Sequence, residues 1–295
     1  MGKIDLHIHT TCSDWILTPF EVIDEAVKNQ VEIIAISDHD TLSAYTDWLF
    51  DYAEQKNIHL VPAVEISTKE KKVWFHVLGY NVDLKDLYFQ ESLFKLRNAR
   101  HQYLFDVAKK LNDCGYFLNV DRLDTIDAVT KAHISQDIID NPQNTNLLLK
   151  EFWYLPNKWE FIETMMNEHC PCYVEKHTIS PKEAVDLIKS AGGFPVLAHP
   201  VASTYEDNIS EDEILTLVKT MWVTAIEGNY VYVDKKGEKH NDSKKWNAFA
   251  EQYWLLSTIW SDFHFFDGIR PVIWLLNEDI PVLDRERIMN AIYKR

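Results

Sequence analysis

The first fourteen residues carry two histidines and an aspartate at a spacing that suits a metal site. His7 and His9 alternate along a segment with strand character, so both imidazoles point to one face. Asp14 follows after a short polar turn. Imidazole together with carboxylate suits zinc, manganese or iron. The segment therefore predicts half of a metal centre.

The same chemistry recurs along the chain, each time near the end of a predicted strand. A lone histidine there is ordinarily a hydrogen-bonded core or surface residue, and a lone aspartate is ordinarily a helix cap. Their repetition favours ligation, because burying so many ionisable groups around one cavity without metal is costly. The nine candidate ligands are His7, His9, Asp14, His39, Glu65, His76, His199, Asp262 and His264.

Two patterns divide the elements that must position these ligands. Residues 1–82 and 179–295 alternate strands and helices, which predicts parallel strands in an open sheet or barrel whose strand ends converge on one mouth. Thr18 and Ser180 have the signature of capping boxes that start helices. A further helix is expected over 41–55 and another over 239–253. Residues 83–178 are helical in pattern and rich in aromatics, and we interpret them as an inserted subdomain.

Composition narrows the class of protein. The hydrophobic fraction of 46% is that of a globular chain. The net charge of −16 argues against binding long nucleic acid, which requires clustered lysine and arginine. We find neither a long apolar run nor room for a signal peptide, and the four cysteines are scattered. We therefore expect a cytoplasmic protein without membrane contact; the oligomeric state stays open.

Six segments together are similar to one family. The chain resembles the polymerase-and-histidinol-phosphatase (PHP) superfamily of metal-dependent phosphoesterases through DLHIHTTCSD, AISDHDT, VPAVEIS, FHVLGY, VLAHP and SDFH. The resemblance implies an α/β fold, a distorted seven-stranded β/α (TIM-like) barrel with an inserted helical subdomain. The stretch YVEKHTISPKEAVDLIKSAGGFPVLAHP resembles the branch of nucleoside-monophosphate and 3′,5′-bisphosphonucleotide phosphatases, which is related to a 5′-to-3′ exoribonuclease.

The resemblance also implies how the ligands are shared among two or three divalent ions (Mn, Zn or Fe). One ion would be held by His7, His9, Glu65 and Asp262. Glu65 would bridge to a second ion completed by His76 and His199. The third ion would be held by Asp14, His39 and His264.

The expected activity is hydrolysis of a phosphomonoester of a small nucleotide by a metal-bridging hydroxide. We expect the catalytic residues to be Asp262, His264 and His199. The expected substrate contacts are Lys131, His133, Lys176 and His177; Lys131 stands where the branch usually has arginine, so a bidentate clamp becomes a point charge. The alternatives are a histidinol-phosphate phosphatase, an exoribonuclease on short RNA, and a non-catalytic metal-stabilised binding protein.

Overall fold

The computed structural model describes residues 3–229, 231–234, 238–259, 261–262 and 282–293. The chain divides into two compact units, one of Met1–Ser92 with Ile179–Arg295 and one of Leu93–Thr178. The assignment of residues 83–178 as an inserted subdomain stays a prediction. Among the described helices, none combines the length and the apolar character needed to span a bilayer.

The first unit is built on a seven-stranded sheet, which confirms the mixed α/β class. The strand order is β1-β2-β3-β4-β5-β6-β9. Its strands are β1 (Lys3–Ile8), β2 (Val31–Ile36), β3 (His59–Glu70), β4 (Val73–Tyr80), β5 (Phe194–Leu197), β6 (Ala225–Asn229) and β9 (Leu256–Ile259). A separate two-stranded ribbon joins β7 (Tyr232–Val233) to β8 (Lys239–His240).

One strand contradicts the expectation of a parallel sheet. The pairs β1–β2, β2–β3, β5–β6 and β6–β9 are parallel, but β4 pairs antiparallel with both β3 and β5. Only Lys71 and Lys72 connect β3 to β4, and Lys71 has a left-handed φ of 56°. A two-residue connection can only turn the chain back on itself, since a parallel neighbour needs a long crossover. The result is a hairpin in which Glu65 and His76 lie within the strands and not at their ends.

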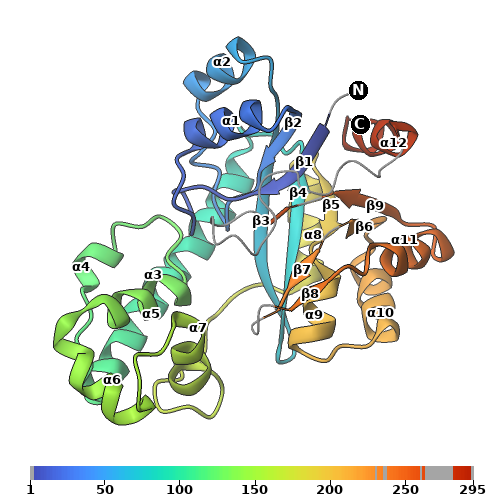
Figure 1. The fold of residues 1–295 in the computed structure, drawn as a ribbon. Helices are drawn as coiled ribbons and strands as arrows, with labels where there is room; N and C mark the ends of the chain where they lie inside the picture. Colours follow the sequence, from blue (N-terminus) through green and yellow to red (C-terminus); the bar gives the residue numbers. More distant parts are fainter. Residues whose placement is uncertain (1–2, 230, 235–237, 260, 263–281, 294–295) are drawn as a thin grey trace. The chain divides into compact units, whose positions relative to one another are not determined.

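Helices pack on the strands of this unit (Figure 1). Helix α1 contacts β2, α8 contacts β3 to β5, and α11 contacts β6 and β9. The helices are α1 (Pro19–Lys28), α2 (Asp47–Gln55), α8 (Pro181–Ser190), α9 (Pro200–Glu206), α10 (Glu211–Met221), α11 (Ser243–Gln252) and α12 (Val282–Tyr293). Thr18 and Ser180 form the predicted capping boxes at α1 and α8. One buried apolar cluster includes residues of all seven strands, among them Ile4, Val61 and Ile259.

Two predicted helices begin later than expected, because residues predicted for their first turns form hydrogen bonds to other parts of the fold instead. Helix α2 begins at Asp47, since the Tyr45 hydroxyl lies within hydrogen-bond distance of the Ile36 and Val61 carbonyls (2.6 and 2.8 Å), either of which can take its one proton, and accepts from the Ala63 amide (2.9 Å). These bonds tie the preceding turn to the sheet. Helix α11 begins at Ser243, because Lys239–His240 pairs with β7.

The second unit is helical. Its elements are α4 (Val120–Leu123), α5 (Lys131–Asp140), α6 (Thr145–Phe152), α7 (Lys158–Phe161), a 3₁₀ turn (Pro142–Asn144), a π turn (Ile162–Met166) and most of α3 (Leu87–Asp113). Leu104, Phe161 and Cys172 belong to its buried apolar core. The buried Asn144 amide donates to the Phe117 and Ile138 carbonyls and accepts from the Phe117 amide, at 2.8–2.9 Å.

Candidate metal centre

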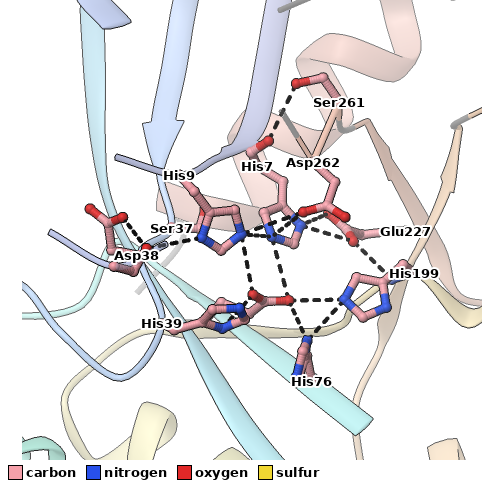
Figure 2. A network of polar contacts seen from close by, with 12 residues as sticks. His7, His9, Ser37, Asp38, His39, His76, His199, Glu227, Ser261 and Asp262 are labelled. Atoms are coloured by element: carbon pink, nitrogen blue, oxygen red, sulfur yellow. Dashed lines mark hydrogen bonds and ion pairs between the residues drawn. The ribbon is translucent and has the colours of Figure 1, made fainter. Parts of the chain in front are cut away.

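Six of the candidate ligands reach one cluster from separate segments of the chain, as Figure 2 shows for His7, His9, His39, His76, His199 and Asp262. His7 lies on β1, and His9 lies one residue beyond the end of that strand. His39 follows β2 in a segment that pairs with β3, where the Asp40 amide donates to the Glu65 carbonyl at 2.9 Å. Residues far apart in the sequence thus meet because neighbouring strands pair.

Glu65 is the central carboxylate. Its Oε1 lies 3.0 Å from His76 Nδ1 and 2.9 Å from His199 Nε2. Its Oε2 lies 2.9 Å from His39 Nδ1 and 3.3 Å from His9 Nε2. The side chain is 1% exposed, so the carboxylate bridges imidazoles from four places in the chain without solvent.

His7, His9 and Asp262 form a second close group. The Nε2 atoms of His7 and His9 are 3.1 Å apart, and they lie 3.6 and 3.4 Å from Asp262 Oδ1. Two nitrogens bound tetrahedrally at the usual zinc distance of about 2.0–2.1 Å would lie roughly 3.3 Å apart. The observed spacing therefore fits two ligands of one ion.

Asp14 approaches the cluster from the loop after β1. Its two oxygens lie 3.5 Å from His9 Nδ1 and 3.5 Å from His39 Nε2. The buried Asp38 carboxylate holds this loop, because it accepts from the Thr10 amide (2.7 Å), the Thr10 hydroxyl (2.6 Å) and the Ser13 hydroxyl. Asp38 thereby positions the segment that carries Asp14.

Backbone strain also gathers here. Asp40, His199 and Asp262 have φ values of 53°, 27° and 47°. Residues other than glycine adopt this region at a cost, and such costs concentrate at functional sites, where the surrounding structure enforces them. The Asp262 amide donates to the His7 carbonyl at 3.0 Å, which holds one of these conformations against β1.

Opposing electrostatic effects act on the buried groups. Burial alone would raise the pKa of Glu65, but attraction to His76, His39 and His7 lowers it well below its ordinary value. Burial alone would lower the pKa of His9, but hydrogen bonds to Asp262 and Glu65 raise it to about 10. Burial prevails at His39 and lowers its pKa to about 4. The pKa values of these two neighbouring imidazoles, 4.7 Å apart between ring centroids, are thus shifted in opposite directions in the metal-free protein.

The donor set fits divalent metal ions. Within the described part of the chain, three groups at this place could each hold an ion: His7–His9–Asp262, His9–His39–Glu65 and Glu65–His76–His199. His39 Nδ1 and Glu65 Oε2 are buried and lack a hydrogen bond of proper geometry to any described residue. Buried polar atoms are rarely left in this way, and a shared cation satisfies both.

A fourth group has the same residue types but lies apart. Asp234, Glu238 and His240 flank the β7–β8 ribbon, and Glu238 is exposed. His240 Nε2 already lies 3.1 Å from Asp234 Oδ2, and its ring stacks on Tyr205. This group is explained as a surface ion pair.

The remaining predicted site residues fall elsewhere. His264 lies outside the described residues. Lys131, His133, Lys176 and His177 belong to the second unit. The Lys131 ammonium donates to the Met166 carbonyl (3.3 Å) and to Asn167 Oδ1 (3.2 Å), and His133 completes the N-terminal capping box of α5. Their contact with substrate stays a prediction.

Sequence reasoning missed Glu227, a further buried carboxylate that contacts the cluster. It lies on β6, is 1% exposed, and contacts His7 Nδ1 at 3.1 and 3.2 Å. Burial raises the pKa of Glu227, against the opposing attraction of His7. The signal was available, since a carboxylate at the end of a predicted buried strand is what singled out Glu65.

No family model matches the chain. The chain is 28% identical over 283 residues to the 5′-3′ exoribonuclease Rnm of Escherichia coli, covering 92% of this chain and 86% of that protein. It is 24% identical to a 5′-3′ exoribonuclease of Haemophilus influenzae, covering 96% of both. It is 26% identical to a 3′,5′-nucleoside bisphosphate phosphatase of Chromobacterium violaceum, covering 90% of this chain and 88% of that protein.

Solved structures share the fold. A candidate metal-dependent phosphoesterase of Bifidobacterium adolescentis has a TM-score of 0.77 at 19% identity, covering 99% of this chain and 96% of that one. A Chromobacterium violaceum protein described as an amidohydrolase, with bound sulfate and no metal, has a TM-score of 0.76 at 23% identity, covering 99% and 98%. The resemblance to PHP-like metal-dependent phosphoesterases is thereby confirmed. Within that class, the chain is similar along most of its length to exoribonucleases and to a bisphosphate phosphatase.

Proposed function

We propose that the chain is a metal-dependent phosphoesterase that hydrolyses a phosphomonoester of a small nucleotide. One observation carries the proposal: five histidines, Glu65 and Asp262 converge in one buried cluster with the spacing of metal ligands. The bisphosphate phosphatase from Chromobacterium violaceum supports this class of substrate.

We also propose that the strands close into a distorted barrel. The Asp262 amide, beyond the last strand in the sheet order, bonds to the His7 carbonyl on the first strand at 3.0 Å. The apolar cluster containing residues of all seven strands is the expected interior of such a barrel.

Two or three divalent ions (Mn, Zn or Fe) would be held by the three groups, with Asp14 and His264 as additional ligands. When bound, such ions polarise phosphate oxygens and lower the pKa of coordinated water. In the three-ion case the ions contribute +6, the carboxylates of Asp14, Glu65, Glu227 and Asp262 contribute −4 and one hydroxide contributes −1, so about +1 remains. This local excess favours a phosphate dianion despite the net charge of −16.

The exposed side of the cluster sets the direction from which substrate approaches. The side chains of Asp262, His76 and His199 are 26%, 25% and 15% exposed, whereas those of His7 and His9 are fully buried. In this proposal Asp262, His76 and His199 lie on the side from which the phosphate approaches, and Asp262 and His199, with His264, are the proposed catalytic residues. His7 and His9 act from behind as rigid ligands.

Recognition beyond the phosphate falls, in this proposal, to the second unit. Lys131, His133, Lys176 and His177 would supply cationic and hydrogen-bonding contacts to a nucleotide. A lysine offers a point charge without the fork of arginine, so contact with one phosphate oxygen is expected.

A 5′-3′ exoribonuclease acting on short RNA is the second candidate. The similarity to exoribonucleases over more than nine-tenths of the chain favours it. The acidic surface opposes it for long RNA, since phosphate-rich chains bind through clustered lysine and arginine. A short oligonucleotide places fewer phosphates against that surface.

The test is a kcat/KM comparison on metal-loaded protein. The substrates are AMP, 3′,5′-bisphosphoadenosine, histidinol phosphate, p-nitrophenyl phosphate and a 5′-phosphorylated RNA pentamer. We expect release of inorganic phosphate, with the nucleotides preferred over p-nitrophenyl phosphate. Release of mononucleotides from the pentamer, without phosphate release from the nucleotides, would establish the exoribonuclease instead.

Two results would overturn both candidates. A preference for histidinol phosphate would move the chain to another branch of the superfamily. Absence of turnover on every substrate, with metal bound, would make it a metal-stabilised binding protein.

A further inference from the structure

Glu227 is buried between two proposed metal ligands, yet it belongs to none of the three ligand groups. We propose that Glu227 is a positioning residue. Its carboxylate orients the imidazole ring of His7 and also holds the backbone amide of His199, so that both histidine rings present Nε2 to metal. The inference rests on the proposed metal-dependent function and deepens it.

The contact with His7 selects one face of the imidazole. His7 Nδ1 lies 3.1 and 3.2 Å from the two oxygens of Glu227, so Nδ1–H donates to the carboxylate. The proton on Nδ1 leaves Nε2 as the ligand atom. Nε2 points the other way, 3.1 Å from His9 Nε2, 3.4 Å from Glu65 and 3.6 Å from Asp262. A carboxylate that fixes the tautomer of a ligating histidine is a recurrent device in metal sites.

The contact with His199 acts on the backbone. The His199 amide donates to Glu227 Oε2 at 2.9 Å. His199 has φ 27° and ψ 56°, an unfavourable conformation immediately before α9. The hydrogen bond offsets part of the cost of this conformation. Without it, the partly buried His199 amide would lack a hydrogen-bond acceptor, which would add a second free-energy cost. The conformation places His199 Nε2 at 2.9 Å from Glu65 Oε1.

Glu227 itself has little freedom to move. It lies on β6 between β5 and β9, and is fully within the sheet. At the next residue, Gly228, a Cβ atom would lie 2.2 Å from Ser257 Oγ and 3.3 Å from Ser257 Cβ, so a side chain there would require Ser257 on β9 to move. One rigid carboxylate thus couples ligands that come from β1 and from the start of α9.

Glutamine is the informative replacement, because it keeps the shape and changes the hydrogen bonds. Its oxygen can still accept from the His199 amide. Its NH₂ then lies at the other carboxylate position, 3.1 Å from His7 Nδ1, where it must donate. Only the amide oxygen, 3.2 Å from His7 Nδ1 and already accepting from the His199 amide, can then accept Nδ1–H. Donation from Nδ1 is weakened, so the tautomer with its proton on Nε2, which cannot bind metal through that atom, becomes more populated.

The experiment compares E227Q, E227D and D137N with the wild type in chelator competition for Zn²⁺. Asp137 is the matched control, a buried carboxylate of the second unit that accepts from Arg122 and the Asn119 amide. We expect E227Q to bind Zn²⁺ about 10- to 100-fold more weakly, the usual cost of losing such a partner. D137N should bind like the wild type, and E227D, which keeps an acceptor and the charge, should lose less than E227Q.

A spectroscopic readout separates positioning from mere support of the fold. In ¹⁵N-histidine NMR of the zinc-loaded protein, His7 should be protonated on Nδ1 in the wild type and in E227D. In E227Q the fraction with that pattern should fall. If E227Q does not fold, the Zn²⁺ affinity of E227D becomes the deciding measurement. Zn²⁺ binding that is at least threefold weaker than in the wild type, with His7 still protonated on Nδ1, supports the inference. Wild-type Zn²⁺ affinity in E227D overturns it.

Unchanged zinc affinity and an unchanged His7 pattern in folded E227Q would overturn the inference. Equal losses in E227Q and E227D would assign Glu227 to packing and also overturn it. Failure of the proposed function is a different result, because the wild type itself would then bind no Zn²⁺.

Discussion

Polar groups are buried in both units, but they are satisfied in opposite ways. In the helical unit, Asn144 uses each of its hydrogen-bonding positions on backbone partners, and the buried atoms that lack partners include the neutral hydroxyls of Tyr103 and Tyr116. In the strand unit, imidazoles and carboxylates face each other, and buried atoms of His39 and Glu65 lack proper partners. The unsatisfied atoms of the helical unit are neutral hydroxyls, whereas those of the strand cluster belong to an imidazole and a carboxylate, a donor set that fits cations.

The largest effect should come from removing a ligand of that cluster. Asp262→Ala and His9→Ala are each expected to abolish turnover and to lower the bound metal, since the ion that activates water loses a ligand. Activity, metal content and circular dichroism of the purified variants are the measurements. His240→Ala, a histidine of the surface pair with Asp234, is the control. Wild-type turnover in either ligand variant, with its fold intact, would refute the site.

A truncation in the helical core should give the converse result. Leu104 is fully buried, and Leu104→Ala is expected to cost about 2–5 kcal/mol of unfolding free energy. The metal content should not change, because the proposed ligands lie in the other unit. Urea unfolding and elemental analysis of the same samples test this. A parallel loss of metal would show that the two regions are not energetically separate.

The pH dependence of metal binding sharpens the comparison further. The pKa of His9, raised from 6.5 to about 10, means that its protonated form stabilises the metal-free fold fully below pH 6.5 and progressively less as the pH rises toward 10. Metal needs the deprotonated ring, so its apparent affinity should rise roughly tenfold per pH unit for each proton displaced. The difference in Tm between metal-loaded and chelator-treated protein should therefore grow from about pH 6 to about pH 9. A constant difference would contradict the assignment of His9 as a ligand.

The smallest expected effect concerns recognition by the helical unit. Lys131→Ala should raise KM for nucleotides roughly tenfold, about 1.4 kcal/mol, and leave kcat nearly unchanged. Lys150, an exposed lysine on α6, provides the control Lys150→Ala. Equal KM values for the wild type and Lys131→Ala would remove Lys131 from the substrate site and leave the metal centre unaffected.

Local features of the sequence predicted local structure well. The capping boxes at Thr18 and Ser180 were predictable because each is closed by hydrogen bonds within three residues. The late start of α2 was not, since Tyr45 is held by carbonyls of β2 and β3. The antiparallel β4 was missed because neither Lys71 nor Lys72 is a usual turn residue.

The sequence by itself determined which side chains are available for chemistry and in which short motifs they stand, because residue type and near-neighbour spacing are local properties. Only the tertiary structure decided that Glu65 is central, that His76 arrives from within a hairpin, and that Glu227 joins His7 to His199. The physical reason is that these contacts depend on which strands pair in space, as β4 does with β5, where Leu78 lies opposite Val196 more than a hundred residues later, and no local pattern records which strands will be neighbours.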